Sequence, residues 1–351
     1  MRSVNFARLA AVTIASYLLC FVSQDAFAGN RWVDGTQSSK LNTVVRNKKG
    51  TKIFLLDSGN NNLLVINTKT EKVVRKLPLS GVPADIALSK NDKFLAISTG
   101  RSITRINLKN FKAKDFVIPE SVEGEIVSLA FGSKKNIFCG SSVDRQWGKL
   151  YLLDKKGMVI NEFGVGPDLN QMVYCPLIKT DAKGRSLYIG YRGVSPTSIY
   201  KLDVTKNDKP VFIAEDEHGE LGSNLRDFAI SPTRNEIYVA SGYPYGIQVV
   251  NSDNLRLISV LHTDAYPGSV DVSSDGKEIY GTATSPYNNF LYKFDAQNRQ
   301  LIKSYPLLSE VWNGGPQPRG VCVADSGRKA FVIHGSDYYD SMQLQVVDTN
   351  M

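Results

Sequence analysis

Short runs of alternating apolar and polar residues recur along the chain and are separated by polar turns. Runs such as 85–89, 227–231 and 269–273 repeat every second residue, which is the side-chain period of a half-buried β-strand. β-Branched and aromatic residues dominate these runs. Apolar spacing of 3.6 residues is not sustained over any long stretch, so we expect few helices. The pattern predicts an all-β protein of many short strands.

Two sequence markers recur in phase, seven times each. One is an apolar residue or pair followed by Asp or Asn, and it ends at Asn67, Asn107, Asp154, Asp203, Asn251, Asp295 and Asp348. The other follows a polar turn and is an apolar, usually aromatic pair that begins at Ile53, Phe94, Ile137, Leu187, Ile237, Ile279 and Ala330. A repeat of about 40–50 residues with several short strands is typical of a β-propeller. The sequence therefore predicts a seven-bladed β-propeller with four-stranded blades.

The two ends of the chain fit together as one blade. The seventh repeat stops at Met351, soon after Asp348, and so lacks an outer strand. Residues 30–35 precede the first repeat and contain Trp32 and Val33 as apolar anchors. We predict that this segment adds to the last blade and closes the ring, which removes a long exposed strand edge. Residues 29–351 would then form one propeller domain.

The first 28 residues have the features of a signal peptide. Arg2 and Arg8 give a positive start, residues 9–22 are mostly apolar, and 26–28 read Ala-Phe-Ala. We expect cleavage after Ala28 and a periplasmic or secreted mature protein. Lipoprotein processing at Cys20 is an alternative, but it requires a small residue where Leu19 stands. No other stretch reaches spanning length, so we expect no transmembrane segment in the mature chain.

The cysteines and histidines do not predict a metal site. Cleavage would leave Cys139, Cys175 and Cys322, an odd number that permits one disulfide at most, and the sequence leaves open whether two of them pair. Their spacing favours buried positions within strands. His218, His262 and His334 come from different repeats and have no short ligand spacing. We therefore predict no metal ion and no cofactor.

Catalytic motifs are missing from the sequence. Acidic residues surround His218 and could serve acid–base chemistry, but the segment 215–222 fits an exposed acidic loop better. GxSxG, Walker, HExxH and CxxC motifs are absent. We predict no catalytic residue.

The formal net charge is +8, and lysines concentrate in one set of turns. Turns after the first and third strands of a blade share one face of a propeller, and they contain residues such as Lys48, Lys90 and Lys277. Two interpretations stay open for this face. It could dock on an anionic surface, or its lysines could simply be solvated turn residues.

The opposite face should bear aromatic, Arg and His residues. Loops on a rigid scaffold are where binding concentrates, and Tyr, Trp and Arg are common interface anchors. We expect a ligand or partner around the mouth of the central channel, on Arg145, Trp147, Tyr191, Arg192, Arg226, Tyr243, Tyr245, His262, Tyr287, Arg319, His334 and Tyr338. The alternative is that such aromatics, Trp312 and Tyr174 especially, only pack neighbouring blades. The partner, a protein or a small molecule, is unidentified, and separation of lysines from aromatics disfavours nucleic acid.

Residues 236–241, Glu-Ile-Tyr-Val-Ala-Ser, and 275–280, Asp-Gly-Lys-Glu-Ile-Tyr, carry a family resemblance. The chain resembles bacterial exported propellers of the YVTN-repeat family, in the superfamily that includes amine dehydrogenase propeller subunits. The literal tetrapeptide is absent, and the nearest match is Tyr238-Val239-Ala240-Ser241. The resemblance implies an exported binding or scaffold protein, often one with no assigned activity, and we predict that this chain has no catalysis of its own. The alternative is an enzyme at the channel mouth, either a lactonase-like hydrolase or the propeller subunit of a periplasmic redox complex.

Overall fold

The computed structural model describes residues 29–132, 136–193, 195–206, 209–217, 219–283, 289–308, 315–336 and 340–350. The predicted signal peptide lies outside the described residues, and so do His218, Tyr287, Trp312 and Tyr338.

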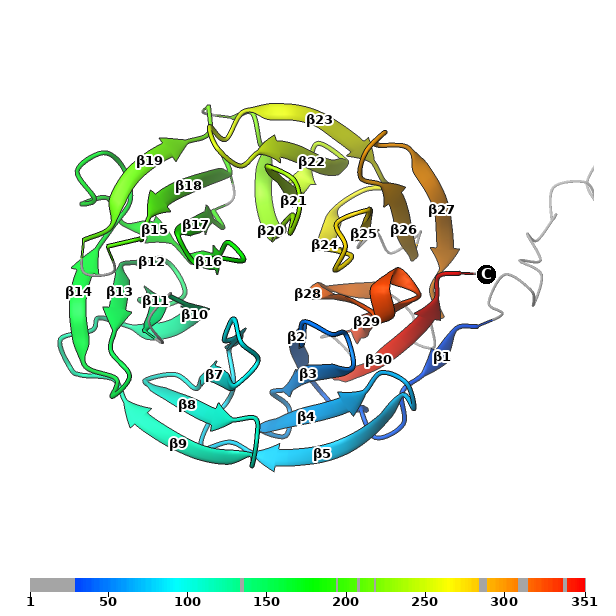
Figure 1. Ribbon diagram of the computed structural model, residues 1–351, viewed down its shortest axis with the longest axis horizontal. Coiled ribbons are helices and arrows are strands. Elements are labelled where there is room, and N and C mark those ends of the chain that lie inside the picture. Colours follow the sequence, from blue (N-terminus) through cyan, green and yellow to red (C-terminus); the bar gives the residue numbers. More distant parts are fainter. Residues whose placement is uncertain are drawn as a thin grey trace, which may run out of the picture.

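Seven four-stranded antiparallel sheets are arranged as a ring, which confirms the predicted propeller (Figure 1). Blade 1 comprises β2 (Leu41–Arg46), β3 (Lys52–Asp57), β4 (Asn62–Asn67) and β5 (Lys72–Pro78). Blade 2 comprises β6 (Asp85–Leu88), β7 (Phe94–Ser98), β8 (Ser102–Asn107) and β9 (Lys112–Val117). Blade 3 comprises β10 (Glu125–Phe131), β11 (Ile137–Ser142), β13 (Leu150–Leu153) and β14 (Val159–Phe163). Blades 4 and 5 comprise β16 (Leu177–Thr180), β17 (Ser186–Tyr191), β18 (Ser198–Asp203) and β19 (Val211–Glu215); and β20 (Ser223–Ile230), β21 (Glu236–Tyr243), β22 (Gly246–Asn251) and β23 (Leu257–His262).

Blade 6 comprises β24 (Pro267–Val272), β25 (Glu278–Ala283), β26 (Phe290–Asp295) and β27 (Leu301–Pro306). Blade 7 comprises β28 (Gly315–Ala324), β29 (Lys329–Ser336), β30 (Ser341–Asp348) and, from the other end of the chain, β1 (Arg31–Trp32). A separate two-stranded sheet pairs β12 (Trp147–Gly148) with β15 (Val173–Tyr174). Helix among the described residues is confined to the short η2 (Asp325–Gly327), and none of it is long and apolar enough to cross a membrane.

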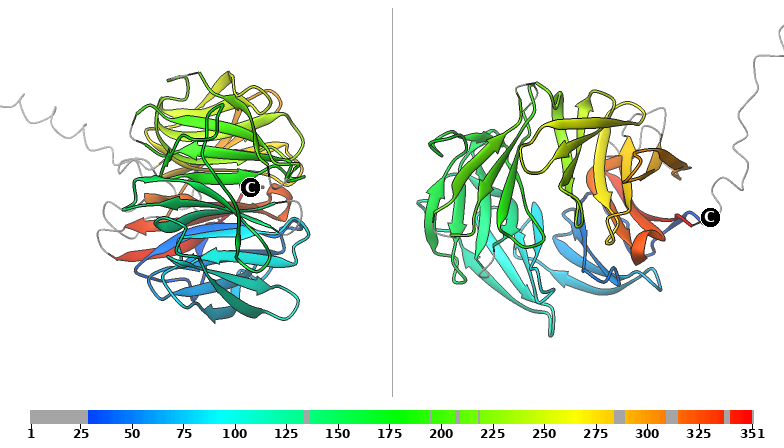
Figure 2. Two further views of the ribbon diagram at one scale, coloured as in Figure 1. Left: turned by 90° about the vertical axis from the view of Figure 1, so that its left-hand side faces the viewer. Right: turned by 45° about the horizontal axis from the view of Figure 1, so that its top comes forward.

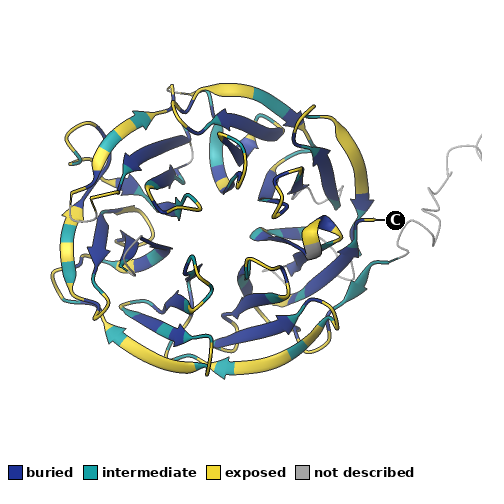
Figure 3. Cartoon of the chain, in the orientation of Figure 1, coloured by how far each residue is buried: buried dark blue, intermediate teal, exposed yellow. Residues whose placement is uncertain are grey.

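The core lies between neighbouring blades, packed face to face around one axis (Figure 2). A middle strand such as β4 is apolar between its two terminal asparagines and is almost wholly buried, whereas the outer strand β5 is largely exposed (Figure 3). One cluster joins Val44 and Leu55 of blade 1 to Phe331 and Leu344 of blade 7. Each blade therefore needs a neighbour on both faces, which explains why the repeats form a closed ring.

Ring closure occurs where the sequence places it. The backbone of Arg31 pairs with Val346, and that of Trp32 pairs with Gln345. The N–H of Val33 then donates to the Leu344 carbonyl at 2.9 Å. Val33 is 1% exposed and belongs to the core cluster that joins blades 1 and 7. The prediction that the N-terminal segment completes the last blade is confirmed.

The antiparallel order places the turns after the first and third strands on one face, here called the lysine face. There the N–H of Lys48 donates to Asp92 Oδ2 at 2.9 Å, from one blade to the next. Burial lowers the pKa of Lys90, the negative charge of Asp181 opposes that shift, and the positive charges of Lys48 and Arg185 add to it. First turns of blades 1, 2 and 4 thus bring charged side chains of both signs close together on this face.

Candidate binding face

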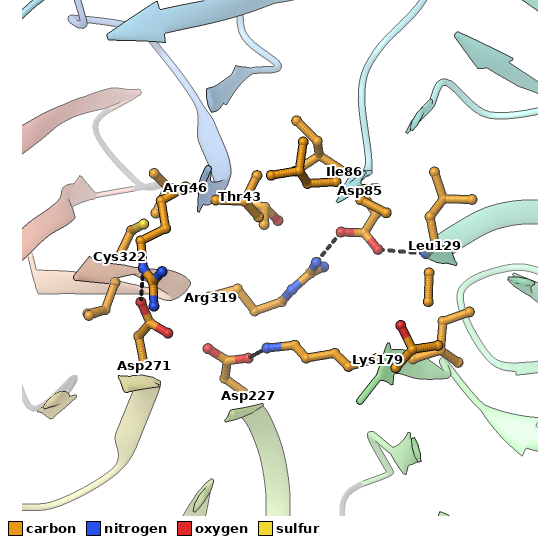
Figure 4. A pocket seen from close by; sticks show the side chains of 18 of the residues that line it. Thr43, Arg46, Asp85, Ile86, Leu129, Lys179, Asp227, Asp271, Arg319 and Cys322 are labelled. Carbon is orange, nitrogen blue, oxygen red and sulfur yellow. Dashed lines mark hydrogen bonds and ion pairs between the residues drawn. The ribbon is translucent and has the colours of Figure 1, made fainter. Parts of the chain in front are cut away.

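The first strands of the blades line a central channel that encloses about 320 Å³. Six charged residues line it and form three ion pairs, whose side chains are drawn in Figure 4. Arg319 pairs with Asp85, Lys179 Nζ lies 2.8 Å from Asp227 Oδ1, and Arg46 Nε lies 3.8 Å from Asp271 Oδ2. Burial raises the pKa of Asp271, and the charge of Arg46 opposes that shift. The channel therefore contains as many described acidic groups as basic ones.

The channel carboxylates also hold adjacent blades together. An innermost strand has no neighbouring strand on the channel side, so its N–H groups need other acceptors. Asp85 Oδ2 in blade 2 accepts from Leu129 N at 2.7 Å and from Ser128 Oγ at 3.1 Å in blade 3. Asp227 Oδ2 in blade 5 accepts from Ser269 Oγ at 3.1 Å and from Val270 N at 3.3 Å in blade 6. These two acids have a structural role between blades.

A second cavity, of about 330 Å³, opens on the face opposite the lysines. It is lined by Tyr174, Cys175, Arg192, Asn224, Leu225, Arg226 and Pro318. These residues lie before or at the start of first strands or after a second strand, where the connections of this face gather. None of the seven is acidic, so the lining is positively charged. We call it the arginine cavity.

Arg192 is held in the arginine cavity by a backbone carbonyl and a thiol. Its Nε donates to the Cys175 carbonyl at 2.7 Å, and its Nη2 lies 3.1 Å from Cys175 Sγ. Burial lowers the pKa of Arg192, and the nearby charge of Arg319 lowers it further. Within the described chain Arg192 forms no ion pair, and exposed Arg226 forms neither an ion pair nor a hydrogen bond.

Three aromatic rings form a cluster on one side of the arginine cavity. The ring of Trp147 lies 5.6 Å from that of Tyr174 and 5.7 Å from that of Tyr191, and the two tyrosine rings are 6.0 Å apart. Pairing of β12 with β15 sets Trp147 directly opposite Tyr174. Trp147 is 44% exposed. Because Tyr174 also lines the cavity, this first aromatic cluster reaches its edge.

Three tyrosines form a second aromatic cluster on blades 5 and 6. The ring of Tyr245 lies 6.2 Å from that of Tyr243 and 5.4 Å from that of Tyr266. Their exposed fractions are 63% for Tyr243, 48% for Tyr245 and 46% for Tyr266. A Cβ on Gly242 would lie 3.0 Å from Asn224 Cβ and 3.4 Å from Tyr266 Cδ1. Asn224 lines the cavity, so this cluster flanks it from the other side.

The structure brings together six of the residues that the sequence predicted. Trp147, Tyr191, Arg192, Arg226, Tyr243 and Tyr245 lie in or beside the arginine cavity and its two aromatic clusters. Arg145 is exposed near Trp147, and His262 is exposed at the end of β23. Tyr287 and Tyr338 lie outside the described residues.

Two predicted residues have surroundings that differ from the expectation. Arg319 lies in β28 rather than in a loop, and it reaches into the channel to pair with Asp85. His334 was expected in an exposed loop, which is wrong, because it lies within β29 and is 1% exposed. Its ring meets that of Trp32 edge to face at 6.0 Å. Burial lowers the pKa of His334 to about 4, so this histidine is a neutral core residue at neutral pH.

From the sequence we placed Tyr174 and Tyr266 on this face but not among the site residues, and we did not predict Cys175 or Asn224. The channel carboxylates were not predicted either, although Asp85 and Asp227 occupy the same position in first strands of two repeats. That equivalence is a signal available in the sequence. Cys139, Cys175 and Cys322 are free, and Cys139 and Cys322 are buried within strands, as expected. The same expectation is wrong for Cys175, which is partly exposed in the connection between β15 and β16. The described residues contain no group of three or more His, Cys, Asp or Glu side chains that could hold a metal ion.

Comparison with known proteins supports the fold. No family model matches the chain, and no curated protein matches it. Among solved structures, a chain of hydrazine synthase from Kuenenia stuttgartiensis is similar, with a TM-score of 0.62 and 13% sequence identity. The similarity covers 89% of this chain and 96% of that chain. At this identity the likeness shows a common propeller fold.

Proposed function

We propose that the protein is an exported binding protein that holds a partner on the face containing the arginine cavity and the two aromatic clusters. Exposed aromatic side chains on a rigid scaffold are the usual anchors of protein interfaces. Here Trp147, Tyr243, Tyr245 and Tyr266 are each between 44% and 63% exposed. The observation that carries the proposal is their grouping in two clusters on either side of an uncompensated basic cavity.

The proposal includes the compartment and the family. The signal-peptide features of residues 1–28 support export to the periplasm or the exterior. The strand sequences around Tyr238 and Tyr280 support a place among YVTN-repeat propellers. In this proposal the chain acts by binding, and any chemistry belongs to the partner.

A capture experiment with variants of the two faces tests this function. The tagged mature chain is incubated with envelope extract of its source cells, and bound proteins are identified by mass spectrometry. The test variant combines Trp147→Ala with Tyr245→Ala. The control combines Lys69→Ala with Lys277→Ala, two exposed residues of the lysine face. Thermal unfolding establishes that both variants fold.

We expect the wild-type chain and the lysine-face control to capture the same protein, and the aromatic double variant to lose about tenfold or more of it. Removal of two large anchors from an interface typically has an effect of this size. Undiminished capture by the aromatic double variant would contradict the proposal. Loss of capture in the lysine-face control alone would move the interface to the other face.

A further inference from the structure

We propose that the arginine cavity is a carboxylate-binding site, with Arg192 and Arg226 as the groups that hold the anion. This deepens the proposed function, on which it rests only in placing the ligand on the same face. The first observation is the charge balance at the channel mouth. Arg319 has a counterion in Asp85, whereas Arg192 and Arg226 have none in the described chain.

Asp85 is the counterion of Arg319 and does not also serve as the counterion of Arg192. Its Oδ1 pairs with Arg319, and its Oδ2 accepts from Leu129 N at 2.7 Å and from Ser128 Oγ at 3.1 Å. Both oxygens are therefore engaged in holding blades 2, 3 and 7. The negative charge of Asp85 raises the pKa of Arg192 against the effect of burial, but the two side chains do not form an ion pair.

The guanidinium of Arg192 is fixed by two contacts and keeps further N–H donors that are unused in the described chain. Bonds to the carbonyl and the sulfur of Cys175 use its Nε and Nη2. A guanidinium has five N–H groups, and those remaining have no partner among the described residues. A partly buried cation without a counterion is costly, and an anion that enters the cavity would relieve that cost. Fixed, planar donors suit the two oxygens of a carboxylate.

The cavity and its borders define the rest of the ligand. A volume of about 330 Å³ accommodates a small organic acid or a single acidic side chain or chain terminus. The ring of Tyr174 borders it on one side, and Asn224 and the second aromatic cluster border it on the other. An acid with a flat apolar body would therefore place its carboxylate on the arginines and its body against a tyrosine ring.

Benzoate and its neutral analogue benzamide test the site directly. Binding is measured at low ionic strength by saturation-transfer NMR titration of the whole mature chain. We expect saturable benzoate binding with a Kd on the order of 1 mM, and benzamide at least about tenfold weaker, because the charged contacts are lost. Arg226→Gln should weaken benzoate about tenfold and leave benzamide unchanged. Arg192→Gln should do the same, and exposed Arg226 keeps the test valid if that variant does not fold.

Arg75→Gln is the matched control, because Arg75 is an exposed arginine on the outer strand of blade 1. It should leave benzoate binding unchanged. Equal binding of benzoate and benzamide, absence of saturable benzoate binding, or an equal loss in the Arg75 variant would each overturn the site.

Cys175 offers a second, chemical readout. It is the partly exposed cysteine beside Arg192, whereas Cys139 and Cys322 are buried. Its sulfur displaces iodide from iodoacetate or iodoacetamide, forms an S–C bond and loses its proton to solvent. If the cavity binds carboxylates, the ratio of the iodoacetate rate to the iodoacetamide rate should be higher for Cys175 than for free cysteine. Arg226→Gln should bring this ratio back to the value for free cysteine. No preference for the anionic reagent in the wild-type chain would contradict the proposal.

The source of the carboxylate is decided by competition. If the partner protein supplies it, benzoate at saturating concentration should reduce capture from the envelope extract, and if a free acid is the ligand, capture should be unaffected. Both results support the carboxylate site, provided the benzoate titration succeeds. Since that titration needs no partner, failure of the site and failure of the proposed function are separate outcomes.

Discussion

The backbone of Trp32, in the two-residue strand β1, pairs with that of Gln345 in β30, so the two ends of the chain share one blade. The junction is reinforced by charge, because the guanidinium of Arg31 contacts Asp348 at 2.9 Å and also pairs with Glu71 of blade 1. Burial opposes ionisation of Glu71, but hydrogen bonds from Arg31 and Lys329 lower its pKa overall. The last blade is thus joined to the first by main-chain and side-chain contacts.

Val33→Ala tests the contribution of this junction to stability. Val33 is 1% exposed within the cluster that joins blades 1 and 7, so truncation leaves a cavity there. We expect a loss of about 2 kcal/mol in the free energy of unfolding, measured by denaturant titration. Val74→Ala, at a residue 55% exposed on β5, is the control and should change stability by less than about 0.5 kcal/mol. Equal effects of the two substitutions would mean that the N-terminal segment does not hold the ring closed.

Asp85→Ala tests the structural role of the channel carboxylates. The substitution leaves the guanidinium of Arg319 without its counterion and the N–H of Leu129 without its acceptor. We expect a loss of about 3–5 kcal/mol in the free energy of unfolding. Asp34→Ala, at an exposed residue, should have almost no effect. A loss below about 1 kcal/mol for the Asp85 variant would show that the blades do not depend on this pair.

Asp216 predicts a dependence of stability on pH. Burial raises its pKa to about 7, and the like charges of Glu215 and Glu220 add to the shift. Ile199 N donates to its Oδ1 at 2.6 Å, but its Oδ2 has no partner in the described chain. Between about pH 4 and pH 7 the unfolded chain releases this proton while the folded chain keeps it. The contribution of Asp216 to stability therefore decreases as the pH rises through that window.

Asp216→Asn should flatten the pH dependence and raise the free energy of unfolding at pH 8 by on the order of 3 kcal/mol. The measurement is denaturant unfolding at pH 5 and pH 8. Glu120→Gln, which changes an exposed carboxylate, serves as the control and should leave the wild-type difference intact. A variant at residue 216 that is as pH-dependent as the wild-type chain would contradict this assignment.

Export predicts a defined N-terminus. In cells that secrete the full chain, the mature protein should begin at Gly29, because signal peptidase cleaves after the Ala-Phe-Ala sequence of residues 26–28. Intact-mass analysis of the envelope fraction checks this. Cys20→Ala should leave the cleavage site unchanged. A mature protein that begins with a lipid-modified Cys20 would show lipoprotein processing instead.

The seven blades and their four strands could be predicted from the sequence, because every blade packs against its neighbours with residues of the same type at the same positions. The aromatic pairs, such as the one that begins at Ile237, fill the space between blades and so recur in phase. Ring closure also followed from the sequence, since blade 7 lacked an outer strand and Trp32 and Val33 were left over.

The arginine cavity could be predicted only in part, because it arises outside the repeat. Trp147 and Tyr174 meet through the additional sheet of β12 and β15, which has no counterpart in the other blades among the described residues. Arg192 and Cys175 meet because Cys175 precedes β16 and Arg192 follows β17, and the pairing of these two strands in blade 4 brings the two connections together. We predicted a loop at His334 because the repeat pattern implies a shorter second strand, but β29 extends to Ser336.

Site-specific photocrosslinking in the source cells tests most directly whether the aromatic face is where a partner binds. A photoreactive phenylalanine analogue replaces Tyr245 in one strain and the exposed Lys69 of the lysine face in another. We predict a discrete, higher-mass adduct on irradiation from position 245 and none from position 69. An adduct from position 69 alone, or equal adducts from both positions, would contradict the proposed binding face.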